Sequence, residues 1–156
     1  QDNELSWFDW DLVQKNKDLL RFTRQLIGFT QSRAIFSEER FLRLSEDPEH
    51  PYVIWHGVQL NEPDWRSTSH TIACTLVHPR QNEKIHLLFN AFWEELSFDL
   101  PKTHSKKWRR IADTSLKSPE DFCEISDSPA VRTKTYGVPA RSAVMLYLKE
   151  LTFTNE

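Results

Sequence analysis

Apolar residues recur with a helical period in one early part of the chain. Between Leu12 and Gln31 they fall mostly three or four positions apart, with Lys and Arg between them. This spacing places them on one broad stripe of a helix, so it predicts one long amphipathic helix. Asp11 is the predicted N-cap, with Gln14 three residues later as in a variant of the capping box. The stripe consists of Val13, Leu19, Leu20, Phe22, Leu26, Ile27 and Phe29.

After the segment EDPEHP the helical period gives way to short apolar runs separated by turn residues. Within TIACTLV, for example, Ile72, Cys74 and Leu76 are expected on one side of a strand, because successive side chains point to opposite faces. The runs are YVIWHG, HTIACTLVH, KIHLLFNAF, ELSFDL, KWRRIADT and SAVMLYLKEL. The segment FNAFWEE is predicted to be a hairpin connection. The pattern therefore predicts a mainly β protein, an antiparallel β-sandwich preceded by the long helix.

Composition narrows the classes of partner. The 156 residues are 38% hydrophobic and carry 23 acidic against 20 basic side chains, a net charge of -3. The charges are well mixed, and KKWRR is the single basic cluster, which is typical of a solvated strand end. We therefore expect no nucleic-acid partner. No run is long and apolar enough to span a membrane, so no membrane partner is expected either.

Cysteine usage bears on the compartment. Cys74 and Cys123 lie far apart, and neither belongs to a CxxC pair, so no redox or zinc motif is present. Cys74 stands inside an apolar run and is expected to be a small core residue. A disulfide between the two remains open at this level. A cytoplasmic location is the favoured expectation.

No catalytic or ligand motif emerges from residue spacing. The chain has three scattered glycines, and no Walker, GxGxxG, HExxH or GxSxG motif. Its six histidines match no metal-ligand spacing and are better explained as strand-face or loop residues. The carboxylates nominate no pair for glycoside hydrolysis, and they do not cluster as a calcium site would require. We expect no metal, no cofactor and no catalytic residue in this chain.

The tryptophans leave two possibilities open. Six are present, at positions 7, 10, 55, 65, 93 and 108. In a β-sandwich such rings usually fill the core or the seam with a neighbouring domain, but exposed ones can stack on sugar rings. Trp93 stands beside the expected hairpin tip and is the favoured candidate for exposure. It is the candidate for binding sugar directly.

Several motifs, taken in order, resemble one enzyme family. They are QDNELSWFDWDL, LIGFTQSRAIFSEERFL, IWHGVQLNEPDW, IHLLFNAFWEELSFDLP, WRRIADTSLKSPEDF and YGVPARSAVMLYL. Together they resemble the C-terminal part of bacterial glycogen debranching enzymes and isoamylases, members of the α-amylase superfamily. The resemblance extends over almost the whole chain. It fails at Ser32, Arg33 and Ala34, where those enzymes usually carry a His-Pro pair, so this turn is expected to differ in shape.

The resemblance implies a division of the chain and a role for each part. Residues 1–45 would be the tail of a (β/α)8 barrel, namely the loop after its eighth strand and its last helix. Residues 46–156 would be the C-terminal β-sandwich domain. The parent reaction would be retaining hydrolysis of α-1,6 branch points in glycogen or related α-glucans, with the catalytic carboxylates upstream. This piece would stabilise the barrel and be inactive alone.

The resemblance also implies candidate substrate contacts. Residues 1–10 would lie near the rim of the parent's active-site cleft, which makes Asp2, Asn3 and Trp7 candidate substrate-binding residues beside Trp93. An equally good interpretation is that the first three only fix the loop. The partners implied are an α-glucan, reached through the parent enzyme, and the upstream barrel. Two alternatives remain: an α-glucan-binding module that uses exposed aromatic residues, and a protein that self-associates through its exposed helix.

Overall fold

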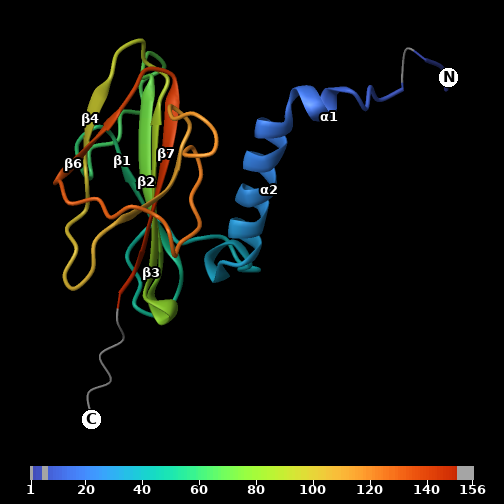
Figure 1. The fold of residues 1–156 in the computed structure, drawn as a ribbon. Coiled ribbons are helices and arrows are strands. Elements are labelled where there is room, and N and C mark those ends of the chain that lie inside the picture. Colours follow the sequence, from blue (N-terminus) through green and yellow to red (C-terminus); the bar gives the residue numbers. More distant parts are fainter. Residues whose placement is uncertain (1, 5–6, 151–156) are drawn as a thin grey trace.

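The chain folds into three layers that lie side by side in Figure 1. The computed structural model describes residues 2–4 and 7–150. A five-stranded antiparallel sheet in the order β1-β2-β3-β7-β5 forms the middle layer, a two-stranded sheet of β4 and β6 covers one face, and a helix covers part of the other. The strands are β1 Tyr52–His56, β2 Thr71–His78, β3 Glu83–Asn90, β4 Leu96–Asp99, β5 Arg109–Asp113, β6 Thr135–Val138 and β7 Ser142–Lys149. The mainly β, antiparallel architecture is confirmed and is consistent with a β-sandwich.

One predicted strand connection is wrong. FNAFWEE does not join paired strands, because β4 hydrogen-bonds to β6 and belongs to the other sheet. The segment after Asn90 therefore carries the chain from one sheet across to the other. Sequence analysis did not predict β6, which has only four residues and includes Gly137, so it shows no alternation of polarity.

The helical region is divided into pieces. It consists of α1 Leu12–Lys15, α2 Lys17–Gln31 and the short 3₁₀ helix η1 Ala34–Phe36. Asn16 interrupts the predicted single helix between α1 and α2, with φ -109° and ψ 28°. The predicted cap is also wrong: the Asp11 backbone is already helical and its side chain makes no capping hydrogen bond. A capping side chain needs an extended backbone at that position to reach the following amides.

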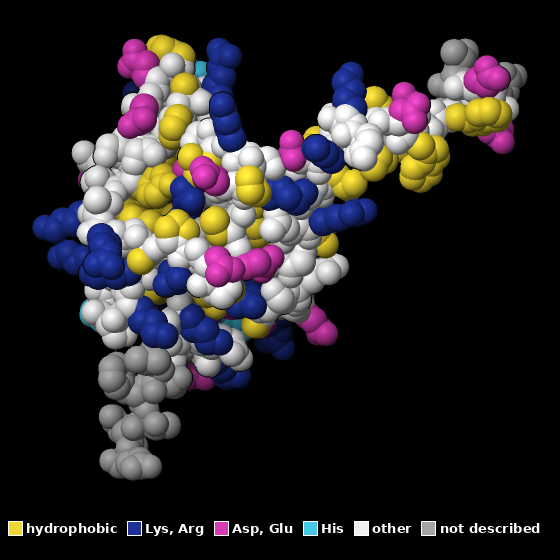
Figure 2. All heavy atoms as spheres, in the orientation of Figure 1, with side chains coloured by type: hydrophobic (Ala, Val, Ile, Leu, Met, Phe, Trp, Pro, Cys, Tyr) yellow, Lys and Arg dark blue, Asp and Glu magenta, His cyan; other side chains and the backbone are white. Residues whose placement is uncertain are grey.

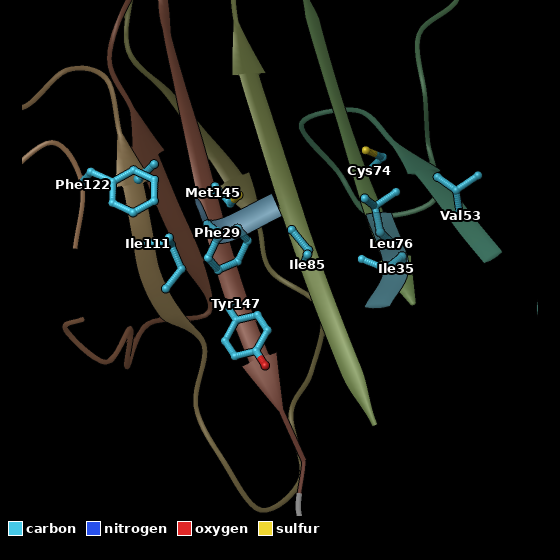
Figure 3. Close-up of a cluster of buried hydrophobic side chains, with 11 residues drawn as sticks. Phe29, Ile35, Val53, Cys74, Leu76, Ile85, Ile111, Phe122, Met145 and Tyr147 are labelled. Atoms are coloured by element: carbon cyan, nitrogen blue, oxygen red, sulfur yellow. The ribbon is translucent and has the colours of Figure 1, made fainter. Parts of the chain in front are cut away.

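The alternation within the strands sorts residues onto two faces of the large sheet. On the helix side, Phe29 of α2 and Ile35 of η1 pack against Ile85, Met145 and other strand residues (Figure 3). We call this cluster the helix-side core. On the opposite face, Leu88 and other residues pack against the small sheet. This inner core contains Ala73, Leu88, Phe98, Leu100, Trp108, Val138, Val144, Leu146 and Leu148. The predicted orientation of Cys74 and Leu76 toward one face is confirmed, since both belong to the helix-side core.

The turn at which the resemblance fails forms a specific contact with the sheet. Arg33 Nη1 donates to the Tyr147 hydroxyl at 3.0 Å and to Glu83 Oε1 at 3.4 Å. Its guanidinium also lies over the rings of Phe29 and Tyr147, at 5.6 and 5.4 Å from their centroids. The Glu83 carboxylate is buried and needs such a partner. Arg33 therefore attaches the end of α2 to the adjacent strands β3 and β7.

Candidate functional site

A shallow depression lies on the surface beside the connection from β1 to β2. It has a volume of about 350 Å³, is open to solvent, and mixes aromatic with polar side chains. Its lining comes from the loop before β2, from the start of β2 and from the end of β3. The lining residues are Asp64, Trp65, Arg66, Ser69, His70, Thr71, Ile72, Phe89 and Ala91. We call this the aromatic depression.

Trp65 provides the largest exposed ring of the aromatic depression. Its side chain is 64% exposed. Its ring packs edge to face with that of Trp55, with 5.5 Å between the ring centroids and an interplanar angle of 73°. Trp55 lies on β1 and packs against the helix-side core, so it links Trp65 to the sheet. Arg66 donates from Nε and Nη2 to the two carboxylate oxygens of Asp64 at 2.9 and 2.8 Å. These hydrogen bonds lower the pKa of Asp64 to about 2.

Trp93 lies beside the aromatic depression and is held by two rings. It is 63% exposed. Its ring stacks on that of Phe92, with 3.8 Å between the ring centroids, and lies 5.8 Å, centroid to centroid, from the ring of the lining residue His70. The buried Asn90 fixes this turn. Its Nδ2 donates to the carbonyls of Glu94 and Val138 at 2.9 Å, and its Oδ1 accepts the amide of Phe92 at 2.9 Å. The predicted exposure of Trp93 is confirmed.

The other predicted site residues lie in a different part of the molecule. Trp7 Nε1 donates to Asp2 Oδ1 at 2.6 Å, so these two are in contact with each other. They belong to an arm before α1 that extends away from the sheets and carries exposed hydrophobic side chains (Figures 1 and 2). Asn3 lies in the same arm. The structure therefore does not bring Asp2, Asn3 and Trp7 together with Trp93.

Buried histidines form a hydrogen-bonded chain in the interior. The Asn61 amide donates to His56 Nδ1 at 2.8 Å, so the proton of His56 is on Nε2, which lies 2.9 Å from Thr75 Oγ1. Thr75 Oγ1 in turn lies 2.9 Å from His86 Nδ1. Burial, with a smaller contribution from His56, lowers the pKa of His86 to about 3, and burial also lowers that of His56. Both rings are neutral structural residues at neutral pH.

Nothing in the described part of the chain resembles a metal or redox centre. Within residues 2–4 and 7–150, no three or more His, Cys, Asp or Glu side chains gather as metal ligands would. Cys74 and Cys123 are both free thiols, so the possible disulfide is not formed, and burial raises the pKa of Cys74 to about 11. Among those same residues, no helix has the length and apolar character needed to cross a membrane.

Comparison with known proteins identifies the family. The family described as Isoamylase 1-3, C-terminal, matches residues 54–149. The chain belongs to this family. The aromatic depression and Trp93 lie wholly inside the matched part, whereas the arm, α1 and α2 come before it. The predicted resemblance to isoamylases and glycogen debranching enzymes is thereby confirmed.

Individual relatives agree with the family match. The chain is 29% identical over 165 residues to the glycogen operon protein GlgX homolog of Mycobacterium tuberculosis, with 94% of this chain and 22% of that protein covered. It is 32% identical over 133 residues to chloroplastic isoamylase 1 of Arabidopsis thaliana, covering 85% of this chain and 16% of that protein. It is 30% identical over 122 residues to chloroplastic isoamylase SU1 of Zea mays, covering 78% of this chain and 15% of that protein. The chain thus spans 15–22% of the length of these relatives.

Most of the aromatic depression was not predicted from the sequence. Trp93 was singled out, but not Trp65 and His70 of the β1–β2 connection or Phe89 of β3. For Phe89 the sequence held one clue. The alternation in β3 places Phe89 on the same face as Ile85. In the structure the helix does not cover Phe89, which is 42% exposed. For Trp65 and His70, only the packed structure shows that they share a surface.

Proposed function

We propose that this chain is the C-terminal part of an α-1,6-glucan debranching hydrolase of the isoamylase type and that it supplies none of the catalytic groups. The family match and relatives named for isoamylase and the glycogen operon support this proposal. The chain's share of those relatives, 22% and 16%, leaves ample length for a catalytic domain. The parent reaction would be retaining hydrolysis through a covalent glycosyl-enzyme. A cytoplasmic location is proposed with it.

The proposed role of residues 1–45 is to form the tail of the upstream barrel, with residues 46–156 as the sandwich that braces it. The single observation that carries this role is the two-sidedness of α2. Phe22, Leu26 and Phe29 pack on the helix-side core, whereas Leu19 and Ile27 remain 65% and 48% exposed. Apolar surface of this kind is stabilised when it is buried, by about 25 cal/mol per Å². An upstream barrel packed on the outer stripe and on the arm would bury it.

A hydrolysis assay tests this function. Reducing-end release from glycogen is measured for the 156-residue chain and for its natural upstream-extended form. We expect activity only in the extended form, because the carboxylates are supplied upstream. A matched control is the extended form truncated after residue 45, which should have a lower thermal midpoint. Turnover by the 156-residue chain alone, or no activity in either form, would contradict the proposal.

A second candidate function is binding of α-glucan by the β domain itself through exposed aromatic residues. The observation that favours it is Trp93, which is exposed yet held in place by Phe92 and His70. Tryptophan fluorescence should change when maltooligosaccharide is added at millimolar concentration. An unchanged spectrum would leave the domain with a structural role only.

A third candidate is self-association through the outer stripe of α2, which carries the exposed Leu19 and Ile27. If this stripe pairs two copies, deletion of residues 1–31 should weaken any dimer, because the exposed apolar surface is then lost. Sedimentation velocity measures the change. A dimer of equal strength after the deletion would exclude this mode of association.

A further inference from the structure

We infer that the aromatic depression, with Trp93 beside it, is a subsite for a run of several α-1,4-linked glucose units. Trp65 and Trp93 would each stack on a sugar ring. The choice of an α-glucan rests on the proposed function, whereas the existence of a sugar site rests on the side chains of the depression. The site lies on the β domain and requires none of the groups expected upstream.

Both tryptophans are exposed and held in place at the same time. A pyranose ring has one apolar face made of C–H groups, and it stacks on a flat aromatic ring that water can reach. Trp65 is held by Trp55, and Trp93 is held by Phe92 and His70. A ring that is already ordered loses little conformational entropy when a ligand binds. Rings that need burial would instead have turned into the core.

Polar side chains line the depression together with the aromatic rings. Ser69 and His70 offer a hydroxyl and an imidazole group, which can form hydrogen bonds with sugar hydroxyls. The Arg66 guanidinium and the Asp64 carboxylate neutralise each other in a two-point contact. An anionic ligand such as phosphate would need an unpaired cation here. The depression therefore suits an uncharged ligand with many hydroxyls.

The framework of the site is held by hydrogen bonds of the β domain and does not depend on the helix. The Ala91 amide donates to the His70 carbonyl at 2.8 Å, which joins the two segments that carry the rings. Asn90, buried in the inner face, holds the turn that carries Trp93. None of the described residues of α1, α2 or the arm lines the depression. Binding should thus survive in the 156-residue chain as it stands.

The inference is tested by calorimetric titration of the 156-residue chain with maltoheptaose and with maltose. We expect saturable binding of maltoheptaose with a Kd on the order of 1 mM and at least about tenfold weaker binding of maltose, because two glucose units offer fewer rings for stacking than seven. Trp65→Ala and Trp93→Ala should each weaken maltoheptaose binding about tenfold. Both side chains are largely exposed, so circular dichroism should show an unchanged fold.

The matched control is Trp10→Ala, which removes an exposed tryptophan of the arm and should bind as the native chain does. Absence of saturable binding, native affinity in both depression variants, or equal binding of cellohexaose would overturn the inference. These outcomes are distinct from failure of the proposed function. Glycogen hydrolysis by the extended form without binding by this chain would reject the subsite alone, and binding without any hydrolysis would reject the enzyme assignment alone.

Discussion

The two faces of the five-stranded sheet are built from alternate residues of the same strands, yet they are covered to different extents. On the inner face, the small sheet excludes water from the contact, and Leu88, Phe98 and Leu146 are completely buried. On the helix side, α2 and η1 cover only part of the sheet, and Phe89 remains 42% exposed. The inner face is therefore closed, whereas the other face leaves part of its apolar surface in contact with water. Three substitutions test this difference.

The largest effect is expected in the inner core. Phe98→Ala removes a completely buried ring from β4 and should lower the free energy of unfolding by about 3–5 kcal/mol, because a cavity remains between the sheets. Urea denaturation measures the loss. The matched control is Phe89→Ala on the other face, for which we expect less than about 1 kcal/mol, because that ring is already partly in water. Equal losses in the two variants would show that the faces do not differ.

A smaller effect is expected from pH, through the buried histidines of the inner face. The pKa of His86 is about 3 in the folded chain, against 6.5 for an ordinary histidine. Between pH 3 and pH 6.5 the unfolded chain binds more protons at this histidine than the folded chain does. Folding stability from this group is therefore at its full value above pH 6.5 and is lost as the pH falls toward 3. The free energy of unfolding should fall by roughly 1.4 kcal/mol per pH unit in this window, with His56 adding to the fall in its upper part.

Urea denaturation at pH 7, 6 and 5 measures this slope. His86→Gln should flatten it, because the unfolded chain then gains one proton fewer. His104→Gln, which removes an exposed loop histidine, is the matched control. A native slope in His86→Gln would mean that another group controls the acid sensitivity.

A local effect is expected where the helix is attached to the sheet. Arg33→Met keeps the apolar contact with Phe29 but removes the partners of Tyr147 and of buried Glu83, which should cost about 1–3 kcal/mol. The loss should be local, so amide hydrogen exchange should rise in α2 and stay slow in β3 and β7. Arg24→Met, an exposed position on the same helix, is the control. Faster exchange in the strands as well would show that the helix and both cores unfold as one unit.

Much of the architecture followed from local patterns. The alternation in TIACTLV correctly separated Cys74 and Leu76 from Ala73, because side chains on a strand alternate regardless of its neighbours. The order of the motifs was enough to predict the family. The predicted exposure of Trp93 was also correct, since it follows from a turn beside a strand end.

Tertiary structure decided the remaining features. Which strand pairs with β4 depends on contacts between residues far apart in the chain, so local spacing suggested a hairpin where β6 is the true partner. The interruption at Asn16 and the contact of Arg33 with Glu83 likewise appear only in the folded chain. The aromatic depression is the clearest case. Residues near positions 65, 70 and 89 come together because the β2 and β3 register places Ile72 opposite Phe89, and no single segment carries that pairing.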